Sequence, residues 1–135
     1  MNKHMNNSGF TLIELLVAIG IVALLAAYAI PNYRDYVMKS KRTEAMNNLL
    51  QVSHLQERYY ANKNRYATAD ELQLDEIFPT PDDTNERAYS ISMESTNTSY
   101  TVQAKPHGTQ TKDTDCPLFS LDSMGKRKPD NDCWD

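Results

Sequence analysis

An unbroken apolar segment near the N-terminus constrains this 135-residue chain more than any other feature. The segment runs from Phe10 to Ile30, follows a short polar leader that ends in Gly9, and contains a single carboxylate, Glu14. Twenty-one helical residues span about 31 Å, close to the ~30 Å thickness of a bilayer's hydrocarbon core. The sequence therefore predicts a helix over residues 10–31 that can cross a membrane.

The position of Gly9 differs from that of the cleavage site in an ordinary secretory signal, where small residues follow the apolar core. Cleavage after Gly9 leaves the apolar segment on the mature chain, with Phe10 as its N-terminus. A carboxylate inside a membrane helix costs roughly 2.5–3.5 kcal/mol and normally marks a functional site with a partner. For Glu14 the nearest such partner is the α-amino group of Phe10, on the same chain or on a neighbour. The alternative is that Glu14 lies in the headgroup zone.

The residues from Gly9 to Val17, preceded by Lys3, resemble the class III signal of type IV prepilins and of the related pseudopilins. The resemblance implies that a prepilin peptidase cuts after Gly9 and methylates the amine of Phe10, giving N-methylphenylalanine. It also implies that Glu14 pairs with the N-terminus of a neighbouring subunit during assembly.

Three later segments resemble those of a minor pilin of the PilE or ComP-like group: Tyr59–Tyr66, Phe119–Gly125 and Cys133–Trp134. The implied function is that of a minor type IV pilus subunit, which supports pilus biogenesis and pilus-dependent motility, adhesion or DNA uptake. The implied partners are other pilin subunits, major and minor, the prepilin peptidase and the inner-membrane assembly machinery. Two alternatives remain: a pseudopilin of a type II secretion system, and a single-span anchored binding domain that does not assemble.

The remaining sequence predicts an α+β domain. Residues 32–61 form an amphipathic helix whose apolar stripe is Ala45, Leu49, Val52, Leu55 and Tyr59. A loop with a helical turn at 69–74 follows, and alternating segments at 89–93, 100–104 and 118–121 predict strands.

We expect the type IV pilin fold, a long helix packed on three or four antiparallel strands. The expected parts are a leader (1–9), a membrane or filament-core helix (10–31), an amphipathic helix (32–61) and a C-terminal region (62–135). Pro31 removes a helical hydrogen bond, which predicts a bend.

Cys116 and Cys133 are close enough in sequence for a disulfide, which persists in oxidising compartments. Two free thiols or half of a metal site are the alternatives. A disulfide places the C-terminus in the periplasm, with the chain first in the inner membrane as a single span and later in the extracellular pilus. A count of cations opposes this orientation, because the segment after the span carries Arg34, Lys39, Lys41 and Arg42 whereas the leader offers Lys3 and His4.

The sequence contains no recognisable catalytic pattern, and we expect neither enzyme activity nor a cofactor. The histidines His4, His54 and His107 have no ligand spacing or neighbouring nucleophile. The acidic residues around the cysteines are interpreted as a solvated loop, with calcium binding as the alternative. From residue 62 onward, eight Lys and Arg stand against fourteen Asp and Glu, a net charge of −6. This charge disfavours DNA binding, for which the only candidates are Lys126, Arg127 and Lys128.

Overall fold

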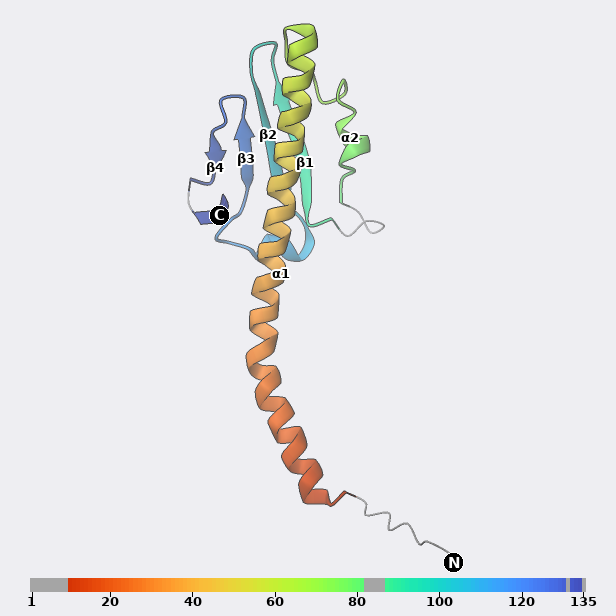
Figure 1. Ribbon diagram of the computed structural model, residues 1–135, viewed down its shortest axis with the longest axis vertical. Coiled ribbons are helices and arrows are strands. Elements are labelled where there is room, and N and C mark those ends of the chain that lie inside the picture. Colours follow the sequence, from red (N-terminus) through yellow and green to blue (C-terminus); the bar gives the residue numbers. More distant parts are fainter. Residues whose placement is uncertain (1–9, 82–86, 131, 135) are drawn as a thin grey trace, which may run out of the picture. The chain divides into compact units, whose positions relative to one another are not determined.

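The computed structural model describes residues 10–81, 87–130 and 132–134. The chain divides into two compact units, Met1–Val37 and Met38–Asp135. The 52-residue helix α1, Leu12–Lys63, supplies residues to both units (Figure 1). The predicted leader, including Gly9, lies outside the described residues.

The second unit contains a four-stranded antiparallel sheet in the order β1-β2-β3-β4 (Figure 1). Its strands are β1 (Tyr89–Ser95), β2 (Tyr100–Pro106), β3 (Phe119–Asp122) and β4 (Arg127–Lys128). The β-branched and aromatic residues of the first three strands suit a pleated, half-buried surface. All three predicted strands are confirmed, and the short β4 completes the sheet.

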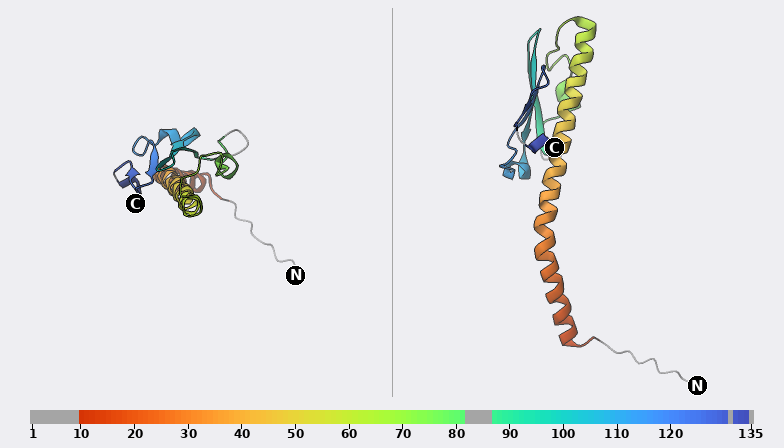
Figure 2. Two further views of the ribbon diagram at one scale, coloured as in Figure 1. Left: turned by 90° about the horizontal axis from the view of Figure 1, so that it is seen from above. Right: turned by 60° about the vertical axis from the view of Figure 1, so that its left-hand side comes forward.

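Within this unit, α1 covers one face of the sheet, as two views show (Figures 1 and 2). Ala45, Leu49 and Val52 have no exposed surface, so the first three positions of the predicted stripe are confirmed. Leu55 is only half-buried, and the next fully buried position is Gln56. At about 100° per residue, position 56 returns to the direction of Ala45, whereas position 55 lies about 80° away.

The core between helix and sheet is built from apolar side chains of α1, of the segment around α2, of the sheet and of the disulfide-linked C-terminal region. The sheet contributes alternate residues, because successive side chains point to opposite faces. Outside α1, the buried members of this apolar cluster are Leu74, Phe78, Tyr89, Ile91, Tyr100, Val102, Ala104, Cys116, Phe119, Leu121 and Cys133.

The segment after α1 contains turns at residues 69–73 and then the short helix α2, Leu74–Ile77. The predicted helical turn at 69–74 is therefore present as turns, and the helix begins where that prediction ended. Gln73 separates the two with a left-handed backbone (φ 52°). The boundary also places Leu74 and Phe78 in the core.

The C-terminal region is closed by a disulfide between Cys116 and Cys133, whose Cα atoms are 5.9 Å apart. This confirms the predicted pairing. The 3-10 helix η1 (Gly108–Lys112) precedes Cys116, and η2 (Asp132–Trp134) contains Cys133. The ring of Trp134 packs edge-on against Phe119, which joins the end of the chain to the core.

Candidate functional site

The first turn of α1 is closed by a reciprocal pair of hydrogen bonds between Thr11 and Glu14. The N–H of Thr11 donates to Oε2 of Glu14 (2.8 Å), and the N–H of Glu14 donates to Oγ1 of Thr11 (3.3 Å). The Thr11 hydroxyl also donates to Oε2, at 2.8 Å. This is a capping box, in which an N-cap Thr and a Glu three residues later satisfy each other's backbone N–H.

Both hydrogen bonds that the Glu14 carboxylate accepts end on Oε2. Within the described part of the chain, no residue donates to Oε1 of Glu14. The side chain is exposed and lies at the start of an apolar helix. Glu14 thus has one satisfied carboxylate oxygen and one that can accept a further donor.

The apolar part of α1 is exposed on both sides of Glu14. Leu12, Leu24 and Tyr28 each keep about three quarters of their surface. By length and composition this helix can cross a membrane, and none of the apolar window is buried within the chain. So large an exposed apolar surface marks a region that a membrane or other protein chains cover.

The helix continues through Pro31, which lies within the bounds of α1. Next to Pro31, Nδ2 of Asn32 donates to the carbonyl oxygen of Tyr28, one turn earlier in the helix (3.1 Å). The bend at Pro31 stays a prediction.

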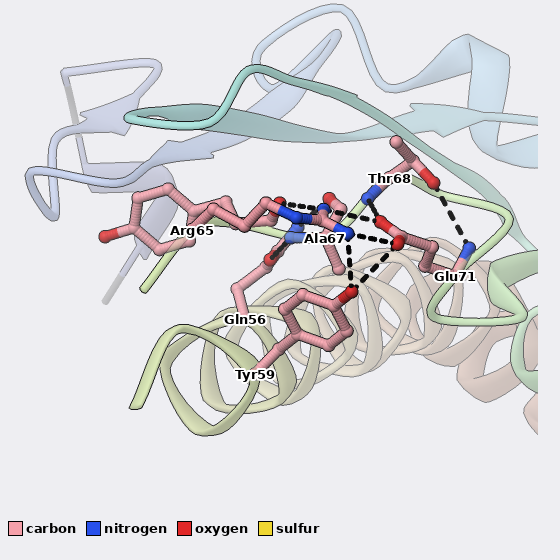
Figure 3. Close-up of polar contacts among 7 residues, drawn as sticks. Gln56, Tyr59, Arg65, Ala67, Thr68 and Glu71 are labelled. Atoms are coloured by element: carbon pink, nitrogen blue, oxygen red, sulfur yellow. Dashed lines mark hydrogen bonds and ion pairs between the residues drawn. The ribbon is translucent and has the colours of Figure 1, made fainter. Parts of the chain in front are cut away.

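A second Thr-x-x-Glu sequence, Thr68 to Glu71, forms a second box in the other unit (Figure 3). The N–H of Thr68 donates to Oε2 of Glu71 (2.9 Å), and the N–H of Glu71 donates to Oγ1 of Thr68 (3.2 Å). Here the carboxylate also binds Arg65, whose Nη2 is 2.5 Å from Oε1 and whose Nη1 is 2.9 Å from Oε2. Oε1 further accepts the hydroxyl of Tyr59 (2.8 Å).

These contacts shift the protonation equilibria of the residues in the second box. The hydrogen bonds from Arg65, together with those from Thr68 and Tyr59, hold the pKa of Glu71 well below its usual range. The hydrogen bond to Glu71 in turn raises the pKa of Tyr59.

Next to the box, the carboxamide of buried Gln56 donates to the carbonyl oxygen of Ala67 and accepts a hydrogen bond from the N–H of Ala67, both at 2.8 Å. Together these bonds fasten the loop after α1 to the end of the helix (Figure 3).

A buried ion pair joins α1 to the segment before Cys116. Nε and Nη2 of Arg42 each donate to one carboxylate oxygen of Asp113, at 2.6 Å. The Asp113 side chain is 2% exposed. Burial raises its pKa, but the hydrogen bonds and charge of Arg42 outweigh this and lower it. Nε2 of Gln110 also donates to Asp113 (3.1 Å) and to the hydroxyl of Tyr89 (3.0 Å).

Sequence reasoning missed both networks in the second unit. Arg42 was counted as a cation next to the membrane, whereas the structure pairs it with a residue 71 positions away. The Thr-x-x-Glu spacing was a readable signal for both boxes. For the Arg42–Asp113 pair the sequence contains no comparable signal.

The three candidate DNA-binding cations lie together at the end of the β3–β4 hairpin. Lys126, Arg127 and Lys128 are exposed, and they follow a turn in which Gly125 has a φ of 79°. The guanidinium of Arg127 lies over the ring of Trp134, 5.1 Å from its centroid. Arg127 and Lys128 thus form the edge strand β4, and Lys126 directly precedes it.

The acidic residues near the disulfide do not gather into a metal site in the described residues, where no group of three His, Cys, Asp or Glu is arranged to hold an ion. Asp113 faces Arg42 instead. Asp135, part of the calcium alternative, lies outside the described residues. His54 and His107 are exposed, and His4 lies in the leader.

Two family models match this chain. One, described as type IV minor pilin ComP, DNA uptake sequence receptor, matches residues 31–120. The other, the prokaryotic N-terminal methylation motif, matches residues 4–30. The chain belongs to the type IV pilin family. The proteins of this family are structural subunits rather than enzymes.

Individual relatives agree with this assignment. The major pilin PilA of Myxococcus xanthus is 37% identical over 86 residues, which are 64% of this chain and 37% of that protein. Fimbrial protein EcpC of Eikenella corrodens is 56% identical over 39 residues, which are 29% of this chain and 26% of that protein. The matches thus span 37% of the first relative and 26% of the second. A solved type IV pilin from Shewanella oneidensis is similar over 73% of this chain and 98% of its own, with a TM-score of 0.55 and 25% identity.

Proposed function

We propose that this pilin is a minor subunit of a type IV pilus, incorporated into the filament or priming its assembly. The observation that carries the proposal is an exposed apolar helix with a single carboxylate, Glu14, in its first turn. The family model that covers residues 31–120 is described as a minor pilin, which supports the minor role.

In this account a prepilin peptidase removes the leader after Gly9 and methylates the new amine of Phe10. The match of residues 4–30 to the methylation motif supports this step. The apolar helix then holds the subunit in the inner membrane, with residues 38–135 in the periplasm. An oxidising compartment suits the Cys116–Cys133 disulfide.

Assembly brings together the groups that the first unit leaves exposed. Helices from neighbouring subunits cover each other's apolar surface, which removes that surface from lipid and water. Glu14 pairs with the amine of Phe10 on an adjacent subunit. A charge left unpaired in a dry bundle is costly, so this pair favours one axial register between neighbouring helices. A bend at Pro31 adapts the helix to the bundle.

Deletion of the gene in its host tests the role. We expect fewer pili in the fraction sheared from the deletion strain, and this protein in filaments sheared from the parent. Abundant pili in the deletion strain, with no copy of this protein in parental filaments, would overturn the proposal. A loss of protein secretion in that strain would instead identify a pseudopilin.

DNA binding is a second candidate function, which the printed description of the family model as a DNA uptake sequence receptor favours. In this chain the cations available for it are Lys126, Arg127 and Lys128 on one exposed edge. The test is fluorescence anisotropy of labelled duplex DNA with the full chain in detergent, over a series of salt concentrations. Binding that weakens with salt and is lost in Lys126→Glu and Lys128→Glu, but not in the exposed control Lys112→Glu, supports the function. No binding at physiological salt contradicts it.

A further inference from the structure

The two capping boxes of this pilin have matching internal geometry. In each box the Thr N–H donates to Oε2 of the Glu, at 2.8 Å for Glu14 and 2.9 Å for Glu71. In each, the Glu N–H donates back to the Thr hydroxyl, at 3.3 and 3.2 Å. The boxes can therefore be compared atom by atom.

They differ in the other donors that the carboxylate accepts. Arg65 donates to both oxygens of Glu71, from Nη2 to Oε1 and from Nη1 to Oε2, and the Tyr59 hydroxyl donates to Oε1. At Glu14 the additional donor is the Thr11 hydroxyl, which binds Oε2. Oε1 of Glu14 receives no donor from the described residues, although the same kind of box holds its Oε2. The Glu71 box shows that a carboxylate held in this way still accepts a cation on its other oxygen.

We propose that Thr11 is a positioning residue for filament assembly, because it holds Oε2 of Glu14 and leaves Oε1 to receive the Phe10 amine of a neighbouring copy. The proposal rests on the proposed function. The Thr11 hydroxyl and N–H fix the side chain of Glu14 against its own helix, so less rotamer freedom is lost when the neighbour's amine binds.

The box is independent of leader removal. Its backbone donors are the N–H groups of Thr11 and Glu14, and both stay in peptide bonds after cleavage between Gly9 and Phe10. Cleavage changes only the amine of Phe10, which becomes a cation one residue before the box. After cleavage each subunit therefore carries both groups that the contact needs: the carboxylate that the box already positions, and a new amine for the next copy.

The test measures incorporation of the full chain into filaments for Thr11→Val, which keeps the shape of Thr but lacks the hydroxyl, and for Thr11→Ser, which keeps the hydroxyl. Incorporation is expressed per copy of processed protein in the membrane, so that an effect on cleavage by the peptidase is separated from an effect on assembly. Loss of the hydroxyl's hydrogen bonds is expected to lower incorporation about tenfold in Thr11→Val. Thr11→Ser is expected to restore it. Thr11→Ala is a second variant without the hydroxyl, for use if Thr11→Val escapes processing.

The same variants are then made in a Glu14→Gln background. A positioning role predicts that Thr11→Val has no further effect there, because no charge remains to be positioned. An equal loss in both backgrounds overturns the proposal, since Thr11 then acts only as a helix cap. Normal incorporation of Thr11→Val, while Glu14→Gln is defective, overturns it as well and leaves the proposed function intact. Absence of the wild-type chain from filaments overturns both.

Discussion

The two Thr-x-x-Glu boxes of this pilin place the same local structure in two different surroundings. In the second unit, Glu71 is held by Thr68 and also by Arg65 and Tyr59, so its charge is matched within the chain. In the first unit, Thr11 is the one described residue that donates to the Glu14 carboxylate. One box receives a cation from its own unit, and we propose that the other receives one from a neighbouring subunit.

This difference extends to the two units as a whole. The second unit pairs its buried carboxylate, Asp113, with Arg42 and covers its apolar face with its own sheet. The first unit exposes an apolar helix and the carboxylate of Glu14, whose Oε1 receives no donor from the described residues. We infer that substitutions in the second unit act on stability, whereas substitutions around Glu14 act on assembly.

Removal of the buried cation in the second unit should have the largest effect on stability. In Arg42→Ala the Asp113 carboxylate, 2% exposed, loses its partner. We expect the free energy of unfolding to fall by about 3–5 kcal/mol. Thermal unfolding of the full chain in detergent, followed by circular dichroism, measures this loss.

The control for Arg42→Ala is Lys41→Ala, one residue earlier on the same helix. Lys41 pairs with Glu44 at 3.3 Å, and both side chains are substantially exposed. An exposed pair contributes about 0–1 kcal/mol. Equal losses in the two variants would contradict the assignment of Asp113 and Arg42 as a buried pair.

Removal of the disulfide should have the next largest effect. The double variant Cys116→Ala and Cys133→Ala opens a loop with a sequence separation of 17 residues. We expect a loss of about 3 kcal/mol in unfolding free energy. Denaturant titration of the full chain measures it. Cleavage of the leader should continue in this variant, because the disulfide belongs to the second unit alone; a failure of processing would show that the units are not independent.

Acid should destabilise the second unit through its paired carboxylates. The pKa values of Asp113 and Glu71 are both lowered in the folded chain, so the unfolded chain binds protons more readily. Their contribution is complete above about pH 5 and is lost as the pH falls below about 4. Melting temperatures between pH 2 and pH 7 test this. Arg65→Met should reduce the fall in melting temperature at low pH, because the pKa of Glu71 then returns toward its usual value. An unchanged fall would contradict the pairing of Arg65 with Glu71.

The smallest expected effect concerns Tyr59. Its hydroxyl donates to Glu71, and this hydrogen bond raises the pKa of the phenol. Glu71→Gln should lower that pKa toward its ordinary value, because the charged acceptor of the hydrogen bond is removed. Carbon NMR of labelled tyrosine follows the titration. A titration of Tyr59 that is the same in Glu71→Gln and in the wild type would contradict the hydrogen bond between the two side chains.

Much of the fold could be predicted because it depends on local periodicity. Alternation along 89–93 and 100–104 identified the first two strands, and helical spacing identified Ala45, Leu49 and Val52 as core. The pattern was misleading at Leu55, because hydrophobicity suggested that residue where geometry buries Gln56. A buried amide is recognisable only once its partner, the backbone of Ala67, is known.

The polar networks were less predictable, for two physical reasons. Arg42 and Asp113 meet only because the chain folds back over 71 residues, so no local pattern connects them. The role that we propose for Glu14 depends on a second copy of the chain, whose position a single sequence does not specify. The Thr11–Glu14 spacing does encode the box, and that part could be read directly.

The most direct test of the account is the incorporation of Glu14→Gln into filaments. Gln can replace Glu in a capping box, so this variant keeps the helix start but removes the negative charge. Sheared filaments and membranes from cells that express the variant at the native level are compared by immunoblot, with leader removal checked by mass. We predict equal processing and membrane content, and at least a roughly tenfold loss from filaments, because the neighbour's amine is left unpaired. Incorporation equal to that of the wild type would contradict the account.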